Sequence, residues 1–434
     1  MKPCVTLLAS ILAGLLLSAC AERGAIEPVQ TFYQQHAPHT DRRGRTLAAY
    51  DAQRSFLPLV LYHALAGEHH GVTYGLDEIA AAGFNAVHAW EPQAPAAFAE
   101  RARDAGLQVV IHWPDEDSVI ALADSPALLA WYLDEEPSFL YPAGETDRRF
   151  AAFEEDRDRI RRHDARAPIV VIDGPPTRKN LARWKRWNAA GDISSHFNYP
   201  VTAKELRGAG PVERVAASAS VARRLVAGKK PLWVVLQAFG GEKRGWLIPR
   251  AATLRAMAYA AITHGATGIV YFAFDSFVTR DDGILGIAPA PRADYGVSVD
   301  YNDDGKPPLA VSDAALAASR TLYRAVSDLN LELATLREAI LSPTSDIDYA
   351  VRPTDAGGRT NAVRALLKPL GDSHVLFAVN VDREDAEVRF RFPRAVSGVV
   401  PLFGTPAPHA VGEEGWTDRF APESVKIYRV GFAP

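Results

Sequence analysis

Eight short apolar runs alternate with helical stretches between residues 56 and 275, and this rhythm constrains the fold more than any other feature of the chain. The runs are FLPLVLYH (56–63), FNAVHAW (84–90), LQVVIHW (107–113), LLAWYLDEE (128–136), PIVVID (168–173), ISSHFNYP (193–200), PLWVVLQAFG (231–240) and GIVYFAFD (268–275). Each run is long enough for one buried strand. Helical segments between consecutive strands are typical of a parallel sheet.

The residues that follow the intervening segments support helices. Residues 74–82 and 95–105 are each followed by a glycine, Gly83 and Gly106, at the position of a helix C-cap. A doubly wound open sheet would need a glycine-rich phosphate turn after an early strand, and neither GxGxxG nor GxxxxGK[ST] occurs. We therefore predict an α/β fold, a (β/α)₈ TIM barrel over residues 51–340, and no cofactor.

Beyond residue 340 the helical pattern gives way to short strands. Segments 374–382, 387–393 and 424–430 are rich in β-branched and aromatic residues and are separated by Gly, Pro and Asp. In the second segment Val388 and Phe390 alternate with arginines, so one face is expected to be buried. Residues 341–434 are therefore predicted to form a small antiparallel β domain, of the β-sandwich type, packed on the barrel.

The first 20 residues have the features of a signal peptide. Lys2 precedes an apolar stretch, residues 7–17, that is too short to span a membrane, and the segment ends Leu-Ser-Ala-Cys at Cys20. This ending resembles a bacterial lipobox, which implies cleavage before Cys20 and lipid on its thiol and on the new amino terminus. Ala21 follows where an Asp would indicate the inner membrane, so we expect the outer membrane. Residues 21–50 are expected to be a tether.

The charge balance argues against two classes of partner. The chain has 48 Lys and Arg against 52 Asp and Glu, a net charge of −4 and a pI near 6.3. Neither nucleic acid nor an anionic membrane surface is an expected partner, and membrane contact is expected only through the N-terminal lipid. Cys4 leaves with the signal peptide and Cys20 carries the lipid, so no disulfide is expected in the mature chain. The sequence indicates no oligomeric state.

The fourth run, LLAWYLDEEP (128–137), carries the strongest catalytic signal. It closes on three consecutive carboxylates and Pro137, which cannot donate a ladder hydrogen bond, so the strand is expected to end there. Alternation assigns Leu129, Trp131, Leu133 and Glu135 to the helix side, and Ala130, Tyr132, Asp134 and Glu136 to the barrel interior. A strand that brings carboxylates to its carboxyl end suits acid–base chemistry in a barrel.

Polar and aromatic residues accumulate at the carboxyl ends of the other strands, on the active-site face of a barrel. They are His63, His88, Trp90, Glu91, His112, Trp113, Asp115, Asp173, His196, Asn198, Tyr199, Gln237 and Asp275. Several histidines would suit zinc, but neither HxH nor HExxH occurs, so no metal site is predicted. Rings that can stack on a pyranose, together with carboxylates, indicate glycoside chemistry. These rings are Trp90, Trp113, Tyr199, Phe239 and Trp246.

A family resemblance rests on LDEIAAAGFNAVHAW (76–90), RARDAGLQVVIHWP (101–114) and DSPALLAWYLDEEP (124–137), which look like the first half of a clan A glycoside hydrolase barrel. Similar patterns continue in residues 236–241 and 255–276. In that clan the general acid is a Glu at the end of strand four, before a proline, so the resemblance implies this role for Glu136. The clan's nucleophile is a Glu at the end of strand seven, where this chain has Gln237.

The sequence thus predicts a glycoside hydrolase that acts on an oligo- or polysaccharide, with Glu136 as proton donor. The predicted substrate-binding residues are Asp134, Glu91, Trp90, His112, Trp113, Asn198, Tyr199, Gln237 and Trp246. Asp275 or Glu91 is the candidate second carboxylate. Strands four and eight lie on opposite sides of an eight-stranded ring, so a Glu136–Asp275 pair is expected at the wider spacing, roughly 6.5–9.5 Å, of an inverting enzyme. Two alternatives stay open, a non-catalytic cell-surface glycan-binding protein and a metal-dependent hydrolase.

Overall fold

The computed structural model describes most of residues 56–433 and two short strands that precede them, β1 (His39–Thr40) and β2 (Thr46–Ala48). Within 56–433 the residues left undescribed are 63–67, 70–71, 74, 90–93, 124, 166, 207–208, 227–229, 242–244, 275–283, 288–311, 355–358, 360, 405–408 and 413–414. The strands β1 and β2 pair with each other inside the segment predicted to be a tether, and β4 (Glu68–His69) pairs with β5 (Val72–Thr73).

A closed parallel barrel of eight strands occupies the described part of residues 59–272, in the order β10-β11-β12-β3-β6-β7-β8-β9. The strands are β3 (Leu59–Leu61), β6 (Ala86–Ala89), β7 (Gln108–His112), β8 (Leu128–Glu135), β9 (Ile169–Asp173), β10 (Ile193–Asn198), β11 (Leu232–Gln237) and β12 (Gly268–Phe272). Each falls inside one of the eight predicted runs. The predicted (β/α)₈ barrel is therefore confirmed.

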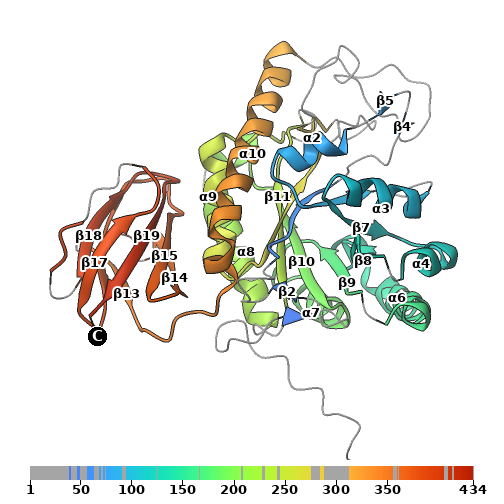
Figure 1. Ribbon diagram of the computed structural model, residues 1–434, viewed down its shortest axis with the longest axis horizontal. Helices are drawn as coiled ribbons and strands as arrows, with labels where there is room; N and C mark the ends of the chain where they lie inside the picture. The colour runs from blue at the N-terminus through green and yellow to red at the C-terminus, as the bar shows by residue number, and fades with distance from the viewer. Residues whose placement is uncertain are drawn as a thin grey trace, which may run out of the picture.

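Helices separate the strands and cover the outside of the barrel (Figure 1). They are α2 (Leu76–Ala81), α3 (Pro95–Asp104), α4 (Glu116–Leu122), α5 (Pro137–Leu140), α6 (Ala143–His163), α7 (Leu181–Ala190), α8 (Pro211–Val226), α9 (Ala251–Thr263) and α10 (Asp313–Leu341), with a 3₁₀ turn at Ala203–Leu206. Gly83 and Gly106 have φ values of 79° and 80°, as a helix C-cap requires. None of the described helices is both long and apolar enough to cross a membrane.

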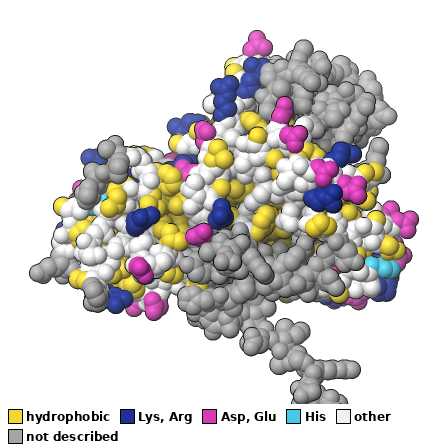
Figure 2. All heavy atoms as spheres, in the orientation of Figure 1, with side chains coloured by type: hydrophobic (Ala, Val, Ile, Leu, Met, Phe, Trp, Pro, Cys, Tyr) yellow, Lys and Arg dark blue, Asp and Glu magenta, His cyan; other side chains and the backbone are white. Residues whose placement is uncertain are grey.

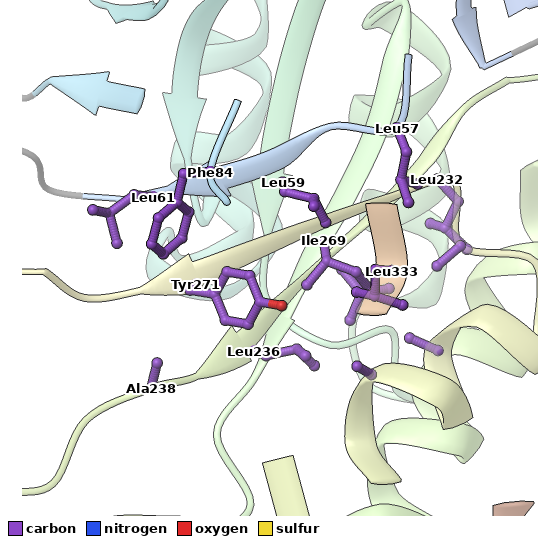
Figure 3. Packing of buried hydrophobic residues seen from close by; sticks show 14 of the residues in the cluster. Leu57, Leu59, Leu61, Phe84, Leu232, Leu236, Ala238, Ile269, Tyr271 and Leu333 are labelled. Atoms are coloured by element: carbon purple, nitrogen blue, oxygen red, sulfur yellow. The ribbon is translucent and has the colours of Figure 1, made fainter. Parts of the chain in front are cut away.

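Two apolar layers follow from the alternation of side chains along the strands. Val60, Val170 and Val235 belong to the layer inside the barrel, and their strand neighbours belong to the layer between strands and helices. Figure 3 shows this outer layer, where Leu59 and Ile269 of neighbouring strands lie beside Leu333 of α10. The barrel interior is packed with side chains, as expected for eight strands, so a site can form only at its mouth.

The alternation breaks twice along β8. The pairing with β7 shifts between Val109 and Val110, and the pairing with β9 shifts between Tyr132 and Asp134. The first shift places Leu129 in the interior layer, whereas simple alternation predicted the helix side. Trp131 and Leu133 lie in the outer layer as predicted. The second shift changes the direction of the carboxylates at the strand end.

The C-terminal domain consists of two antiparallel sheets, β13-β16-β18 and β14-β15-β19-β17. Their strands are β13 (Ala350–Pro353), β14 (Val363–Leu370), β15 (Ser373–Asn380), β16 (Ala386–Arg391), β17 (Val396–Pro401), β18 (Gly415–Phe420) and β19 (Val425–Phe432). Val388 and Phe390 of β16 are buried in the domain's own core, and Arg389 and Arg391 are exposed. This pattern confirms the predicted small antiparallel β domain.

This domain docks on helices α9 and α10 of the barrel. Phe377 of β15 belongs to the apolar layer around the barrel strands, and its ring stacks on Tyr259 of α9 at 6.2 Å. Arg255 of α9 donates to Glu332 of α10 at 2.8 Å and to the carbonyl oxygen of Val425 at 3.2 Å. On the face shown in Figure 2, acidic and basic side chains are intermingled over both domains. The apolar docking and the charged contacts together fix one domain on the other.

We predict that Asp164 is a strong determinant of barrel stability. Its buried carboxylate accepts from Trp131 Nε1 of β8 at 2.9 Å and from the backbone N–H of Ala167 at 3.0 Å. Each buried donor left without its partner costs roughly 1–3 kcal/mol, so loss of both partners in Asp164→Ala should lower the free energy of unfolding by about 2–6 kcal/mol. Asp158→Ala, at an exposed position of α6, is the control and should change it by less than about 0.5 kcal/mol. Equal urea midpoints for the two variants would contradict this role.

Candidate active site

The bulge at Leu133 decides which carboxylates of β8 face the barrel mouth. Tyr132 pairs with Val170 and Asp134 pairs with Val171, so Leu133 has no partner on β9. An extra residue reverses the inward and outward positions beyond it. The prediction that Asp134 faces inward and Glu135 faces the helices is therefore wrong for both residues.

Glu135 lies inside the mouth. Tyr62, which follows β3 three strands away in the barrel, donates its hydroxyl to Glu135 Oε1 at 3.0 Å. The Tyr62 hydroxyl also lies 3.3 Å from that of Tyr132. Burial raises the pKa of Glu135 to about 7, and the hydrogen bond from Tyr62 only partly opposes this effect. Glu135 therefore carries a proton over much of the range below neutral pH.

Glu136 follows the strand in a left-handed conformation, with φ 50° and ψ 34°. Its backbone N–H donates to Ile172 O at 2.8 Å, so the ladder with β9 holds the residue in this geometry. Burial raises the pKa of two tyrosines of the mouth, Tyr132 and Tyr199. The negative charge of the Glu136 carboxylate adds to this increase for both. Glu136 therefore lies close to these two rings of the mouth, and it reaches this place through a turn and not through alternation.

The turn after Glu136 is anchored from behind. Asp173, at the end of β9, accepts from the backbone N–H of Ser138 at 3.1 Å and from its hydroxyl at 2.8 Å. Asn180 donates to the same hydroxyl at 3.1 Å. Burial raises the pKa of Asp173 to about 6, against the hydrogen bonds that stabilise its charge. These contacts fix the first turn of α5, and Glu136 with it.

Asp134 lies on the helix side of β8. The charges of Arg149 on α6 and of Asp173 both act on it, and burial raises its pKa to about 7 in spite of the arginine. Its side chain is almost fully buried there. Asp134 therefore does not reach a substrate in the mouth, and its predicted binding role is corrected to a buried position behind the strand.

One wall of the mouth is a row of stacked rings from β3, β6, β7 and β8. Tyr62 stacks on His88 at 4.0 Å, and His112 stacks on Tyr132 at 3.9 Å. His112 also stacks on Trp113 at 4.1 Å, so neighbouring rings cover both of its faces. His112, predicted to bind substrate, is thus buried in the wall, whereas Trp113 beside it is exposed.

The opposite wall comes from β10, β11 and β12. Tyr199 stacks on Phe272 at 5.4 Å and meets Phe239 edge-on at 5.0 Å. Phe239 in turn meets Trp246 at 5.0 Å. Phe272 also lies 5.2 Å from Tyr62, which joins the two walls. Tyr199 and Trp246 therefore lie at the mouth, and their contact with a substrate stays a prediction.

Gln237 points inward from the end of β11, as predicted, but its amide forms hydrogen bonds with the backbone of the surrounding loops. Oε1 accepts from Val201 N at 2.8 Å, and Nε2 donates to Val201 O, Leu247 O and Phe239 O at 3.0–3.3 Å. The amide has two N–H groups, and both are taken up by these carbonyls. The predicted contact with a sugar or a water is therefore corrected to a clamp on the loops after β10 and β11.

Asn198 points away from the mouth. It donates to Ser218 Oγ at 3.0 Å and to Arg214 O at 3.1 Å, both on α8. His196, two residues earlier, faces the same hydroxyl at 3.1 Å. Phe197 and Tyr199 take the inward positions instead. Asn198 therefore holds α8 on the barrel, and the expectation that it contacts substrate does not fit its place in the structure.

Several predicted residues lie outside the described part of the chain, namely His63, Trp90, Glu91, Asp275 and Cys20. Conversely, Tyr62 and Phe272 belong to the mouth although neither was predicted as a site residue. Alternation from Val60 and Val270, both inside the barrel, would have placed these two rings at the mouth. Within the described residues, no group of three or more His, Cys, Asp and Glu is placed to hold a metal ion.

Comparison with protein-family models finds no match, and comparison with curated protein sequences finds none either. Solved structures do match. Amy13B of Eubacterium rectale has a TM-score of 0.52 at 8% identity, over 86% of this chain and 96% of that one. The alpha-glucosyl transfer enzyme XgtA has 0.52 at 12%, over 86% and 98%. AmyP in complex with maltotriose has 0.50 at 12%, over 87% and 98%.

Identities this low establish likeness of fold alone. The matches extend over most of this chain and nearly all of each similar structure. They agree with the closed parallel barrel and the C-terminal antiparallel sheets described above. The fold that the resemblance to clan A glycoside hydrolases implied is therefore confirmed.

Proposed function

We propose that this protein is a glycoside hydrolase that acts on an oligo- or polysaccharide, with Glu136 as the general acid. The observation that carries the proposal is the pair Glu135–Glu136 at the carboxyl end of β8, in a mouth lined by aromatic rings. Glycoside hydrolases typically use a pair of carboxyl groups to break the glycosidic bond, and aromatic rings beside them can stack on the sugar. The fold likeness to XgtA and to AmyP, which was solved with maltotriose, supports a glycan as the substrate class.

The two carboxyl groups have different surroundings, which supports different roles. Glu135 is largely buried and accepts a hydrogen bond from Tyr62, so it is suited to orient or bind a substrate group. Glu136 lies one residue further out, on a turn that its neighbours anchor. It precedes Pro137, as the general acid does in the family that the sequence resembles. Glu136 is therefore the better proton donor of the two.

Substituting each glutamate by glutamine should separate their roles. Glu136→Gln should lower turnover of natural glycans by about 10²–10⁴-fold, because proton donation to the leaving group is lost. Aryl glycosides with good leaving groups need little protonation at departure, so their turnover should fall much less. Glu135→Gln should lower turnover of both substrate classes to a similar degree.

The controls follow from the same geometry. Tyr62→Phe, which removes the hydroxyl bound to Glu135, should resemble Glu135→Gln and not Glu136→Gln. Kinetics with matched natural and aryl substrates measure the difference. If good leaving groups rescued Glu135→Gln and left Glu136→Gln inactive, the roles would have to be exchanged.

We also propose an inverting mechanism, with Asp275 as the base that activates water. In the barrel order, β12 lies four strands from β8, on the opposite side of the ring, and Asp275 follows β12 by three residues. A base across the mouth leaves room for water, as inverting enzymes require. Proton NMR of the first product should show the inverted anomer, and Asp275→Asn should abolish turnover. A retained anomer, or full activity of Asp275→Asn, would contradict this assignment.

Gln237 favours a second candidate, a glycan-binding protein without catalytic activity. In the family that the sequence resembles, the nucleophile occupies this position, and an amide bonded to three backbone carbonyls is no substitute for it. The two candidates differ in one observable. An enzyme releases new reducing ends from a glycan panel, whereas a binding protein retains the same glycans unchanged.

We further propose that the mature protein is a lipoprotein of the outer membrane. The motif Leu-Ser-Ala-Cys at the end of the apolar leader supports lipid attachment at Cys20. Stable anchoring takes more than one acyl chain. Because the thiol and the new amino terminus that carry the lipid both belong to Cys20, its substitution should release the protein. Metabolic labelling with palmitate should mark the wild type and not Cys20→Ser, and the variant should leave the membrane fraction. Equal labelling of both proteins would refute the proposal.

A further inference from the structure

Trp113 presents a large ring to solvent at the edge of the mouth. Its side chain is 44% exposed, although it directly follows β7 and stacks on the buried ring of His112. Most rings of the mouth are buried or nearly so, and Trp113 differs from them in this respect. A rigidly held, exposed aromatic ring beside a cleft is typical of a binding surface.

The backbone at Trp113 is strained into this position. Its φ of 40° lies in the left-handed region, where residues other than glycine are uncommon. The N–H of Trp113 donates to Tyr132 O on β8 at 3.0 Å, so the strand ladder maintains the conformation. Strain of this kind persists where the surroundings enforce it, and it concentrates at functional sites.

A pocket of about 200 Å³ lies beside this ring, with Pro95, His112, Trp113, Pro114, Asp115 and Ser118 among its lining residues. Asp115 Oδ1 accepts from Ser118 N at 2.8 Å, and this hydrogen bond holds the carboxylate in the pocket. Arg159 of α6 donates to Pro114 O at 3.1 Å. These contacts tie the segment after β7 to its neighbours, so the pocket is formed before any ligand arrives.

We propose that Trp113 and this pocket form a sugar-binding subsite next to the reacting bond, which holds one pyranose ring of an extended glycan. The proposal rests on the proposed function and deepens it, because the substrate class becomes a chain longer than the unit that is cleaved. The apolar face of a pyranose fits the indole ring, and the carboxylate of Asp115 can accept from its hydroxyls.

The position of the subsite follows from the sheet. Strands β7 and β8 are neighbours, and Trp113 and Glu136 each follow the last residue of their strand. Neighbouring strands lie about 4.8 Å apart, a spacing comparable to the length of one sugar unit. Because Trp113 N donates to Tyr132 O, Trp113 lies lower along the strands than Glu136, so a glycan that runs obliquely from β8 toward β7 would place a ring on Trp113.

Binding and turnover of a glycan length series test the subsite. Calorimetric titration of the wild type and Trp113→Ala with oligosaccharides of increasing length should show about tenfold weaker binding for the longer members in the variant. The loss in kcat/KM should likewise be about tenfold larger for these oligosaccharides than for aryl monoglycosides. Trp113→Tyr keeps a ring and should recover most of the loss. Ile120→Ala, an exposed apolar residue of α4 outside the pocket, should change neither quantity.

The outcomes separate this proposal from the proposed function. Weaker binding in Trp113→Ala, with no turnover by the wild type, would support the subsite and refute the hydrolase. An equal loss for short and long substrates would overturn the subsite, because Trp113 would then only support the mouth. Unchanged affinity in Trp113→Ala, or no affinity of the wild type for any oligosaccharide in the series, would overturn it as well.

Discussion

The chemistry of the mouth depends on one extra residue in β8. Leu133 has no pairing partner on β9, and this bulge turns Glu135 into the barrel and Asp134 out toward α6. With regular pairing, Asp134 would be the carboxylate near the hydroxyl of Tyr62. Because of the bulge, the longer side chain of Glu135, and not that of Asp134, accepts the hydrogen bond from Tyr62. Because eight strands enclose little space, a hydroxyl and a carboxylate from strands three apart can meet there.

The small radius of the barrel also explains why the carboxyl groups at its mouth are shielded from water. The interior below the mouth is filled by apolar side chains, so polar groups at the upper layer are partly cut off from water. Burial accordingly raises the pKa of Glu135 to about 7, and that of Asp173 behind the turn to about 6. A carboxyl group whose pKa lies near 7 is partly protonated at neutral pH, and the protonated form can donate as well as accept a hydrogen bond. The packing that stabilises the barrel thus also sets the protonation of the groups at its mouth.

The fold could be predicted from the sequence because a buried strand followed by a helix recurs eight times. Irregular pairing within one strand does not change that pattern. The direction of a particular side chain has no such redundancy. Leu133 is apolar like Trp131, two residues before it, so nothing in the sequence marks it as the bulged residue. Asn198 and Tyr199 are neighbours at the end of one strand, so alternation allows only one of them to face inward, and the bonds of Asn198 to α8 show that it is Tyr199. Gln237 faces inward as alternation predicts, yet carbonyls of two distant loop segments take up its amide.

Backbone strain at the mouth links the carboxylate and the proposed subsite. Trp113 and Glu136 both have positive φ, and they directly follow the neighbouring strands β7 and β8. Glycine would adopt this conformation without steric cost, so stability alone would favour it at both positions. In each case the N–H donates to a carbonyl of the next strand, which holds the residue in place while its side chain turns out of the ladder. Both side chains are thus held by a strained residue at the end of a rigid strand. This arrangement suits groups whose chemistry requires a fixed position.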